Sequence, residues 1–172
     1  VVRREQNLIE PTLERSLSKM TIFDLLFSSE ASNVKSVRRA PHSIIFLAFI
    51  CTKCGEKTKD IGICPEDKVE IPNSRGDTNM HYTCKGCNSR CNVDILNESA
   101  FIPEEAAPTG TRVATVECRG SLQPLKWCYD QIIVTSISGA EMKAPGNEPV
   151  WCDYDETLEE QIELTEMRFT VQ

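Results

Sequence analysis

The stretch "SIIFLAFICTKCGEK" at residues 43–57 joins an apolar segment to a pair of cysteines. Isoleucine and phenylalanine dominate residues 43–50, a composition typical of a β-strand that is buried on both faces. The segment runs directly into Cys51, and Cys54 follows three positions later. This stretch therefore predicts a core strand that ends in a metal-binding or redox turn.

A second pair of cysteines with the same spacing occurs in "YTCKGCNSR" at residues 82–90. A C-x-x-C turn lets two side chains of one hairpin bend toward one point. Zinc accepts four thiolates in a tetrahedron, with Zn–S distances of about 2.3 Å. The two pairs together predict a Zn²⁺ site whose ligands are Cys51, Cys54, Cys84 and Cys87.

The residue after each pair agrees with this interpretation. Gly55 follows the first pair and Asn88 follows the second. This position in a metal-binding turn often takes a positive φ, so that backbone N–H groups can point at sulfur. Glycine adopts that conformation freely, and asparagine is the next most tolerant residue. We expect both residues to have a positive φ.

Other uses of the thiols remain open at this point. The cysteines could form a disulfide within each turn, or one pair could be a redox dithiol. Thioredoxin-like dithiols lie at a helix N-terminus, and neither pair is followed by a helical pattern. Cys91, four residues after Cys87, and His81, three before Cys84, are alternative metal ligands. A second soft-metal site among the remaining thiols is a further alternative.

A zinc ion held by four thiolates is expected to be structural. Catalytic zinc usually has three protein ligands and keeps one position for water. Four thiolates also weaken the metal as a Lewis acid. A zinc deaminase would need a His-x-Glu element, and neither His42 nor His81 has glutamate two residues later. We identify no catalytic residues and expect no enzyme activity.

The composition of the chain limits the kinds of partner and the cellular compartment that we expect. The chain has 172 residues, 40% of them hydrophobic and 26% charged, with a formal net charge of −7. No long basic run is present, which argues against nucleic acid as a partner. Nine cysteines without an N-terminal apolar signal favour a reducing compartment. We expect a monomer in the cytoplasm or nucleus, without membrane contact and with a protein partner.

Short apolar or alternating segments between Pro and Gly breakers predict an all-β, antiparallel β-sandwich. We expect one zinc-binding domain at residues 20–172 and an N-terminal extension at 1–19, as a flexible tail or short helix. Only "DETLEEQ" at 155–161 competes as a helix. The expected strands are at 21–27, 43–50, 67–71, 91–98, 112–119, 131–137 and 162–171. The segment at 112–119 alternates and predicts a half-buried strand.

Four motifs occur in series: "CTKCGE", "RGDTNMHYTCKGCN", "VECRG" and "WCDYDE". Together they resemble the eukaryotic CXXC-motif-containing zinc-binding protein family, from about Thr21 to the end of the chain. The resemblance implies an antiparallel β-sandwich with zinc near one end. It places the family's two cysteine pairs on Cys51, Cys54, Cys84 and Cys87 and assigns no chemistry to the other shared residues.

Two arginines in these motifs, Arg75 and Arg119, suggest a structural role, because guanidinium groups clamp carboxylates. We expect them to tie the acidic turn at 153–156 to the sandwich. The acidic residues of 153–166 are otherwise a solvated face or a surface for a basic partner. The cysteines outside the two pairs are expected to be small core residues: Cys64, Cys91, Cys118, Cys128 and Cys152.

Three functions fit the sequence. The first is a non-enzymatic protein-interaction module with a structural four-thiolate zinc. The second is a thiol or sulfoxide redox enzyme with structural zinc, for which Cys118 or Cys128 would be the nucleophile. The third is an intracellular metal-handling protein that passes zinc or copper to or from a partner.

Overall fold

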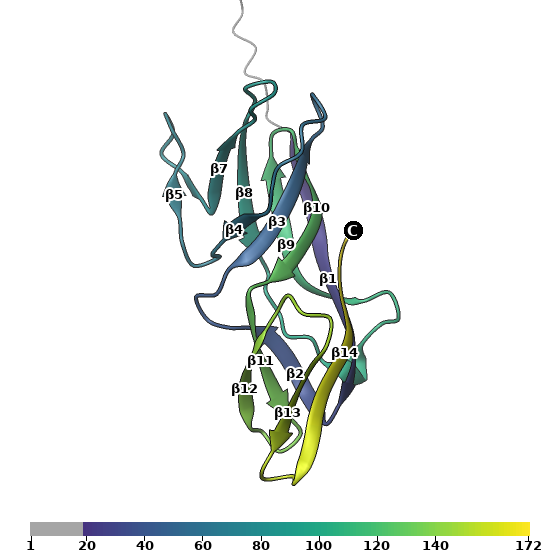
Figure 1. Ribbon diagram of the computed structural model, residues 1–172. Coiled ribbons are helices and arrows are strands. Elements are labelled where there is room, and N and C mark those ends of the chain that lie inside the picture. Colours follow the sequence, from purple (N-terminus) through teal and green to yellow (C-terminus); the bar gives the residue numbers. More distant parts are fainter. Residues whose placement is uncertain (1–18) are drawn as a thin grey trace, which may run out of the picture.

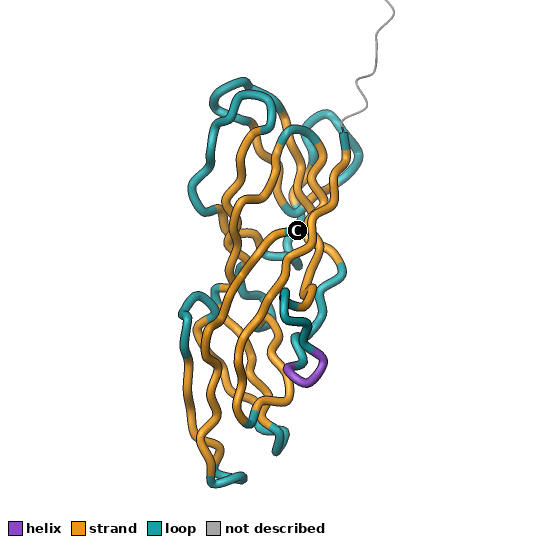
Figure 2. The backbone as a smooth tube through the Cα atoms, turned by 90° about the vertical axis from the view of Figure 1, so that its right-hand side faces the viewer, coloured by secondary structure: helices purple, strands orange, loops and turns teal. Residues whose placement is uncertain are grey.

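A computed structural model describes residues 19–172. The extension predicted at 1–19 lies, apart from Lys19, outside the described residues. The described chain is almost entirely β-strand, with one short 3₁₀ turn, η1 (Pro103–Glu105). Figure 2 shows this turn on one side of a body built from long strands. None of the described helical segments is long and apolar enough to cross a membrane.

The larger layer is a six-stranded antiparallel sheet in the order β13-β14-β1-β9-β8-β7. Its central strand β1 pairs with both β14 and β9 and is bulged on each side, between Leu25 and Leu26 toward β9 and between Ser28 and Glu30 toward β14. The strands are β1 (Met20–Ser32), β7 (Met80–Thr83), β8 (Arg90–Leu96), β9 (Thr111–Arg119), β13 (Trp151–Asp155) and β14 (Glu160–Val171).

Two three-stranded sheets, β10-β3-β4 and β12-β11-β2, form the other layer. The two sheets follow one another along the molecule (Figure 1), because β2 leads into β3 and β10 leads into β11 across Asp130 alone. Strands β5 and β6 form a separate two-stranded sheet. The strands are β2 (Val34–Arg39), β3 (Ile45–Cys51), β4 (Ile61–Ile63), β5 (Val69–Glu70), β6 (Asp77–Thr78), β10 (Leu122–Tyr129), β11 (Gln131–Ser136) and β12 (Glu141–Pro145).

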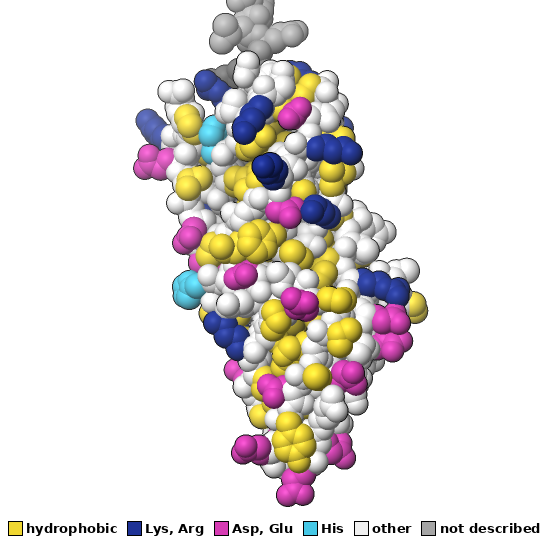
Figure 3. Space-filling model, viewed as in Figure 1, with side chains coloured by type: hydrophobic (Ala, Val, Ile, Leu, Met, Phe, Trp, Pro, Cys, Tyr) yellow, Lys and Arg dark blue, Asp and Glu magenta, His cyan; other side chains and the backbone are white. Residues whose placement is uncertain are grey.

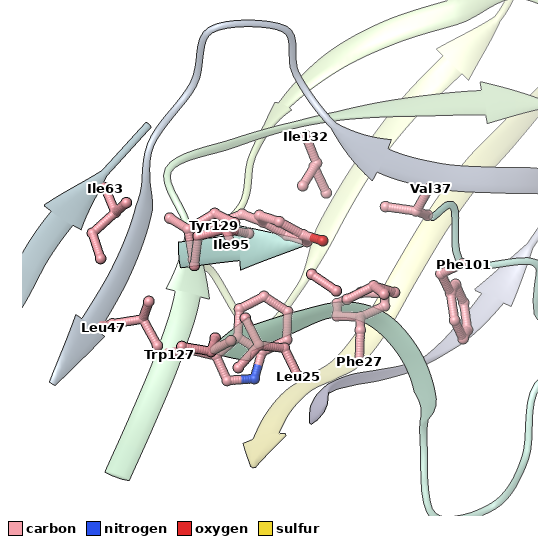
Figure 4. Close-up of a cluster of buried hydrophobic side chains, with 14 of the residues drawn as sticks. Leu25, Phe27, Val37, Leu47, Ile63, Ile95, Phe101, Trp127, Tyr129 and Ile132 are labelled. Carbon is pink, nitrogen blue, oxygen red and sulfur yellow. The ribbon is translucent and has the colours of Figure 1, made fainter. Parts of the chain in front are cut away.

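Aromatic side chains fill the space between the layers (Figure 4). Phe27 meets Phe101 edge-on with ring centroids 4.9 Å apart, and Trp127 meets Phe169 in the same way at 4.9 Å. The indole N–H of Trp127 donates to the carbonyl of Thr170 at 2.8 Å, so its polar atom is satisfied inside the core. Burial of each such side chain contributes about 1.5–3 kcal/mol.

The antiparallel β-sandwich predicted from the sequence is confirmed. One local expectation is wrong, and the one helical alternative does not form. Residues 113–118 of β9 are all buried rather than alternating, because β9 lies between β1 and β8 inside the larger sheet. The segment 155–161 is not a helix: residues 156–159 form the turn between β13 and β14, and the Asp155 carboxylate at its start accepts a hydrogen bond from Ser136 of β11.

Candidate metal centre

The candidate metal centre lies at the end of the sandwich where β3 and β7 finish. Cys51 is the last residue of β3, and Cys54 follows in the turn after it. Cys84 directly follows β7, and Cys87 lies in the turn that leads to β8. In Figure 1 both turns are at the top of the molecule. The sheet β10-β3-β4 and the six-stranded sheet therefore each bring one cysteine pair to the same end of the molecule.

Both turns have the same backbone design. In the first, the amide of Gly55 donates to the carbonyl of Cys51 at 2.8 Å; in the second, the amide of Asn88 donates to the carbonyl of Cys84 at 2.9 Å. Gly55 has a φ of 78° and Asn88 a φ of 56°, as the sequence predicts. A left-handed residue at this point closes the turn and returns the chain toward the next strand.

The four sulfur atoms converge. All lie within 4.8 Å of one another. The Cys51 and Cys87 Sγ atoms are 3.7 Å apart, and those of Cys54 and Cys84 are 3.5 Å apart. Four thiolates around zinc at about 2.3 Å would form a tetrahedron with edges of about 3.8 Å. The spacing therefore fits one metal ion, and it is too long for a disulfide bond of about 2.05 Å. All nine cysteines are free.

Hydroxyl groups favour the thiolate form of one cysteine in each turn. The Ser121 hydroxyl lies 3.3 Å from Sγ of Cys51 and, with backbone N–H groups of the same turn, lowers the pKa of Cys51 to about 6 despite burial. The Ser89 hydroxyl lies 3.1 Å from Sγ of Cys87 and, with its own backbone N–H, lowers the pKa of Cys87. Thiolates are the form that binds metal.

Cys54 has the opposite tendency. The backbone N–H of Glu56 favours its thiolate, but partial desolvation of the sulfur and hydrogen bonding to the other three sulfur atoms raise the pKa of Cys54 to about 12. The cluster thus retains protons that compete with a cation for the same sulfur atoms. A divalent cation held by these four cysteines would replace those protons, so that metal binding would be coupled to proton release.

The alternative ligands lie outside the cluster. His81 pairs through Nδ1 with Oδ1 of Asn92 at 2.8 Å. Cys91 is buried and accepts the amide of Ser121 at 3.4 Å, so Ser121 connects this fifth sulfur to Cys51. Sequence reasoning did not identify Ser121, since it comes from the β9–β10 turn and its spacing to the cysteines carries no local signal.

The role expected for Arg75 and Arg119 is wrong. Arg119 forms an ion pair with Glu117 on its own strand, with Nη2 2.5 Å from Oε1. The carboxylate of Asp155, in the acidic turn, accepts hydrogen bonds from the hydroxyls of Ser136 and Ser138 instead. Arg75 forms no ion pair among the described residues. Hydroxyl groups of the opposite layer therefore anchor the turn.

The remaining cysteines are only partly as expected. Cys91 and Cys118 are buried, Cys64 and Cys128 are intermediate, and Cys152 is exposed. Burial raises the pKa of Cys118 to about 12, with a further contribution from the nearby Cys91, and burial also raises the pKa of Cys128. No second group of metal-ligating side chains occurs in the part of the chain that the structure describes.

Known proteins are similar to this chain in sequence or in fold. The UPF0587 protein C2D10.03c of Schizosaccharomyces pombe is 27% identical over 161 residues, which cover 87% of this chain and 96% of that protein. A hypothetical protein from Plasmodium falciparum superposes with a TM-score of 0.79 at 20% identity, covering 88% of this chain and 99% of the other. The crystal structure of C1orf123 gives a TM-score of 0.76 at 23% identity, with the same coverage.

These two structural likenesses show a shared fold. The model of one protein family, described as CXXC motif containing zinc binding protein, eukaryotic, matches residues 24–172. That range contains both cysteine pairs and nearly all of the sandwich. The chain therefore belongs to the eukaryotic family of CXXC motif containing zinc binding proteins.

Proposed function

We propose that the protein is a non-enzymatic interaction module whose end is held together by one structural zinc ion. The observation that carries this proposal is the convergence of four sulfur atoms from two different sheets within 4.8 Å. A bound zinc would join the turn after β3 to the turn after β7. Such a site contributes on the order of 10 kcal/mol in small domains, which equals the net stability of many proteins.

The donor set supports a structural rather than a catalytic ion. Cys51 and Cys84 are buried, and all four nearest donors are sulfur. Zinc ligated by four thiolates has no vacancy for water or substrate. The protein's own residues then act by orienting the thiolates: Ser121 and Ser89 direct hydroxyl groups at one sulfur in each turn.

The redox alternative has weaker support. Its candidate nucleophiles, Cys118 and Cys128, both have a pKa above that of an ordinary thiol, whereas a reactive cysteine needs a lowered one. Metal transfer is favoured by one feature, the exposure of Cys54, through which a partner thiol could reach the ion. If a cell extract without chelator accelerates the release of zinc, metal transfer is supported. If the extract does not change the rate of release, only the structural role remains.

Hydrogen exchange on the zinc-loaded protein with and without a strong chelator tests the structural role. We expect the amides of 51–56 and 84–89 and the adjoining ends of β3, β7 and β8 to lose protection when zinc is removed. The far sheet β12-β11-β2 serves as the internal control, because it lies away from the cysteines. Equal protection with and without zinc at both ends would refute the structural role.

A further inference from the structure

A cavity of about 300 Å³ adjoins the metal centre. Both metal-binding turns contribute to it: Glu56 and Lys57 follow the first cysteine pair, and Lys85 lies within the second. Thr58, Lys59, Ile61 and Tyr82 complete the lining. A volume of this size is at the lower limit of ligand pockets, so it suits one or two side chains better than a large cofactor.

Two outermost strands meet at this cavity. Ile61 begins β4, the last strand of the sheet β10-β3-β4, and Tyr82 belongs to β7, the last strand of the six-stranded sheet. Among the described strands, β4 and β7 are thus edge strands of the two layers, and the cavity lies where these two edges meet. Outer strands carry backbone N–H and C=O groups that an extended peptide can pair with.

The lining of the cavity has three lysines against one acidic residue, Glu56, so its formal charge is positive, unlike that of the chain as a whole. Lys57, Lys59 and Lys85 are exposed, and none of them takes part in an ion pair among the described residues. The chain as a whole has a net charge of −7. Figure 3 shows Lys and Arg side chains gathered over the upper half of one face, with acidic side chains toward the opposite tip.

We propose that this cavity docks an acidic segment of a partner protein, an inference that rests on the interaction role proposed above. Carboxylates of the segment meet the ammonium groups of the three lysines, while an apolar side chain packs on Ile61 and Tyr82. Charge complementarity selects the segment, and the aromatic and aliphatic lining anchors it. Because both turns line the cavity, the metal centre sets its shape.

A purely local role of the lysines is the competing account. Four thiolates around a divalent ion leave a net negative charge, and Lys85 lies between two of them in sequence. In that account the lysines compensate the charge of the metal centre and have no partner. The two accounts predict different results of lysine substitution. Docking predicts the loss of peptide binding, and the local role predicts the loss of zinc.

Fluorescence anisotropy of a labelled octapeptide with alternating glutamate and leucine, titrated with the full zinc-loaded chain, tests docking. A peptide with glutamine in place of each glutamate is the charge control. The variant Lys57→Gln/Lys85→Gln removes two cavity lysines, and Lys35→Gln/Lys143→Gln removes two exposed lysines of β2 and β12. Zinc content is measured in every preparation. Lys57→Arg/Lys85→Arg keeps the charge.

We expect the cavity variant to bind the glutamate peptide roughly tenfold more weakly than the control variant, with its zinc retained. The arginine variant and the control variant should bind as the natural chain does. Equal binding by the two glutamine variants would overturn docking while leaving the zinc proposal intact. Joint loss of zinc and peptide in the cavity variant, with both kept by the arginine variant, would assign the lysines to the metal centre and overturn docking. Full displacement of the peptide by free glutamate or phosphate at millimolar concentration would also overturn it, as a small-anion site.

Discussion

A Cβ atom at Gly86 would lie 2.9 Å from Sγ of Cys54, in the other metal-binding turn. The two turns are therefore packed so closely that the second has room only for glycine at this point. The next nearest atom to such a Cβ is Cβ of Glu56 at 3.3 Å, also from the first turn. The fit between the turns is thus part of the metal centre.

Gly86→Ala is expected to weaken zinc binding, because the added methyl group displaces the Cys54 sulfur from the cluster. Competition with a zinc-binding dye should show a loss of affinity of about tenfold or more, the scale of disruption around metal ligands. Gly76→Ala is the matched control, since its Cβ would be no closer than 3.7 Å to any other group. Equal affinity of the two variants would contradict the close packing of the turns.

Asn88→Ala is expected to lower the free energy of unfolding of the zinc-loaded protein by about 1 kcal/mol, because alanine tolerates a left-handed conformation less well than asparagine. Asn73, with a φ of 61°, has the same strain away from the cysteines. Asn73→Ala is therefore the control variant. Urea unfolding of Asn88→Ala and Asn73→Ala, with zinc affinity measured in parallel, separates the loss of stability from the loss of zinc binding. Only Asn88→Ala should also reduce zinc affinity; a reduction in both would contradict a specific role of the turn.

Ser121→Ala is expected to reduce zinc affinity by about tenfold, because a hydroxyl that hydrogen-bonds a ligand sulfur supports that ligand. The hydroxyl lies 3.3 Å from Cys51 Sγ and 3.6 Å from Cys91 Sγ. Cys91→Ala removes the contacts of Ser121 with Cys91 but keeps the one with Cys51, and it should leave zinc affinity nearly unchanged. Chelator titration of both variants gives the comparison, and a larger loss for Cys91→Ala would make Cys91 part of the site.

The acidic turn gives a prediction about pH. Hydrogen bonds from Ser136 and Ser138 lower the pKa of Asp155 from 3.8 to about 2. The stabilisation is complete above the unfolded value of about 4 and is lost as pH falls from about 4 through 2. Asp155→Asn should therefore unfold at lower urea than the natural chain at pH 6, and the difference should shrink toward pH 2. A difference that is constant over this range would contradict the assignment.

The sequence was most informative where chemistry and backbone conformation coincide. Spacing and turn residues located the cysteine pairs and the positive φ at Gly55 and Asn88, because both signals are local. The roles of Ser121 and Asp155 could not be predicted, since their partners are distant in the chain and meet them only after the sheets have packed. The clamp expected of Arg119 failed for a different reason: its own strand supplies a nearer carboxylate, that of Glu117.

The most direct test of the account is native mass spectrometry of the intact protein as purified from cells. The account predicts one zinc ion per chain, absent from Cys51→Ser/Cys84→Ser and retained in Cys64→Ser/Cys152→Ser. A natural chain that carries no zinc while all nine cysteines titrate as free thiols would contradict it.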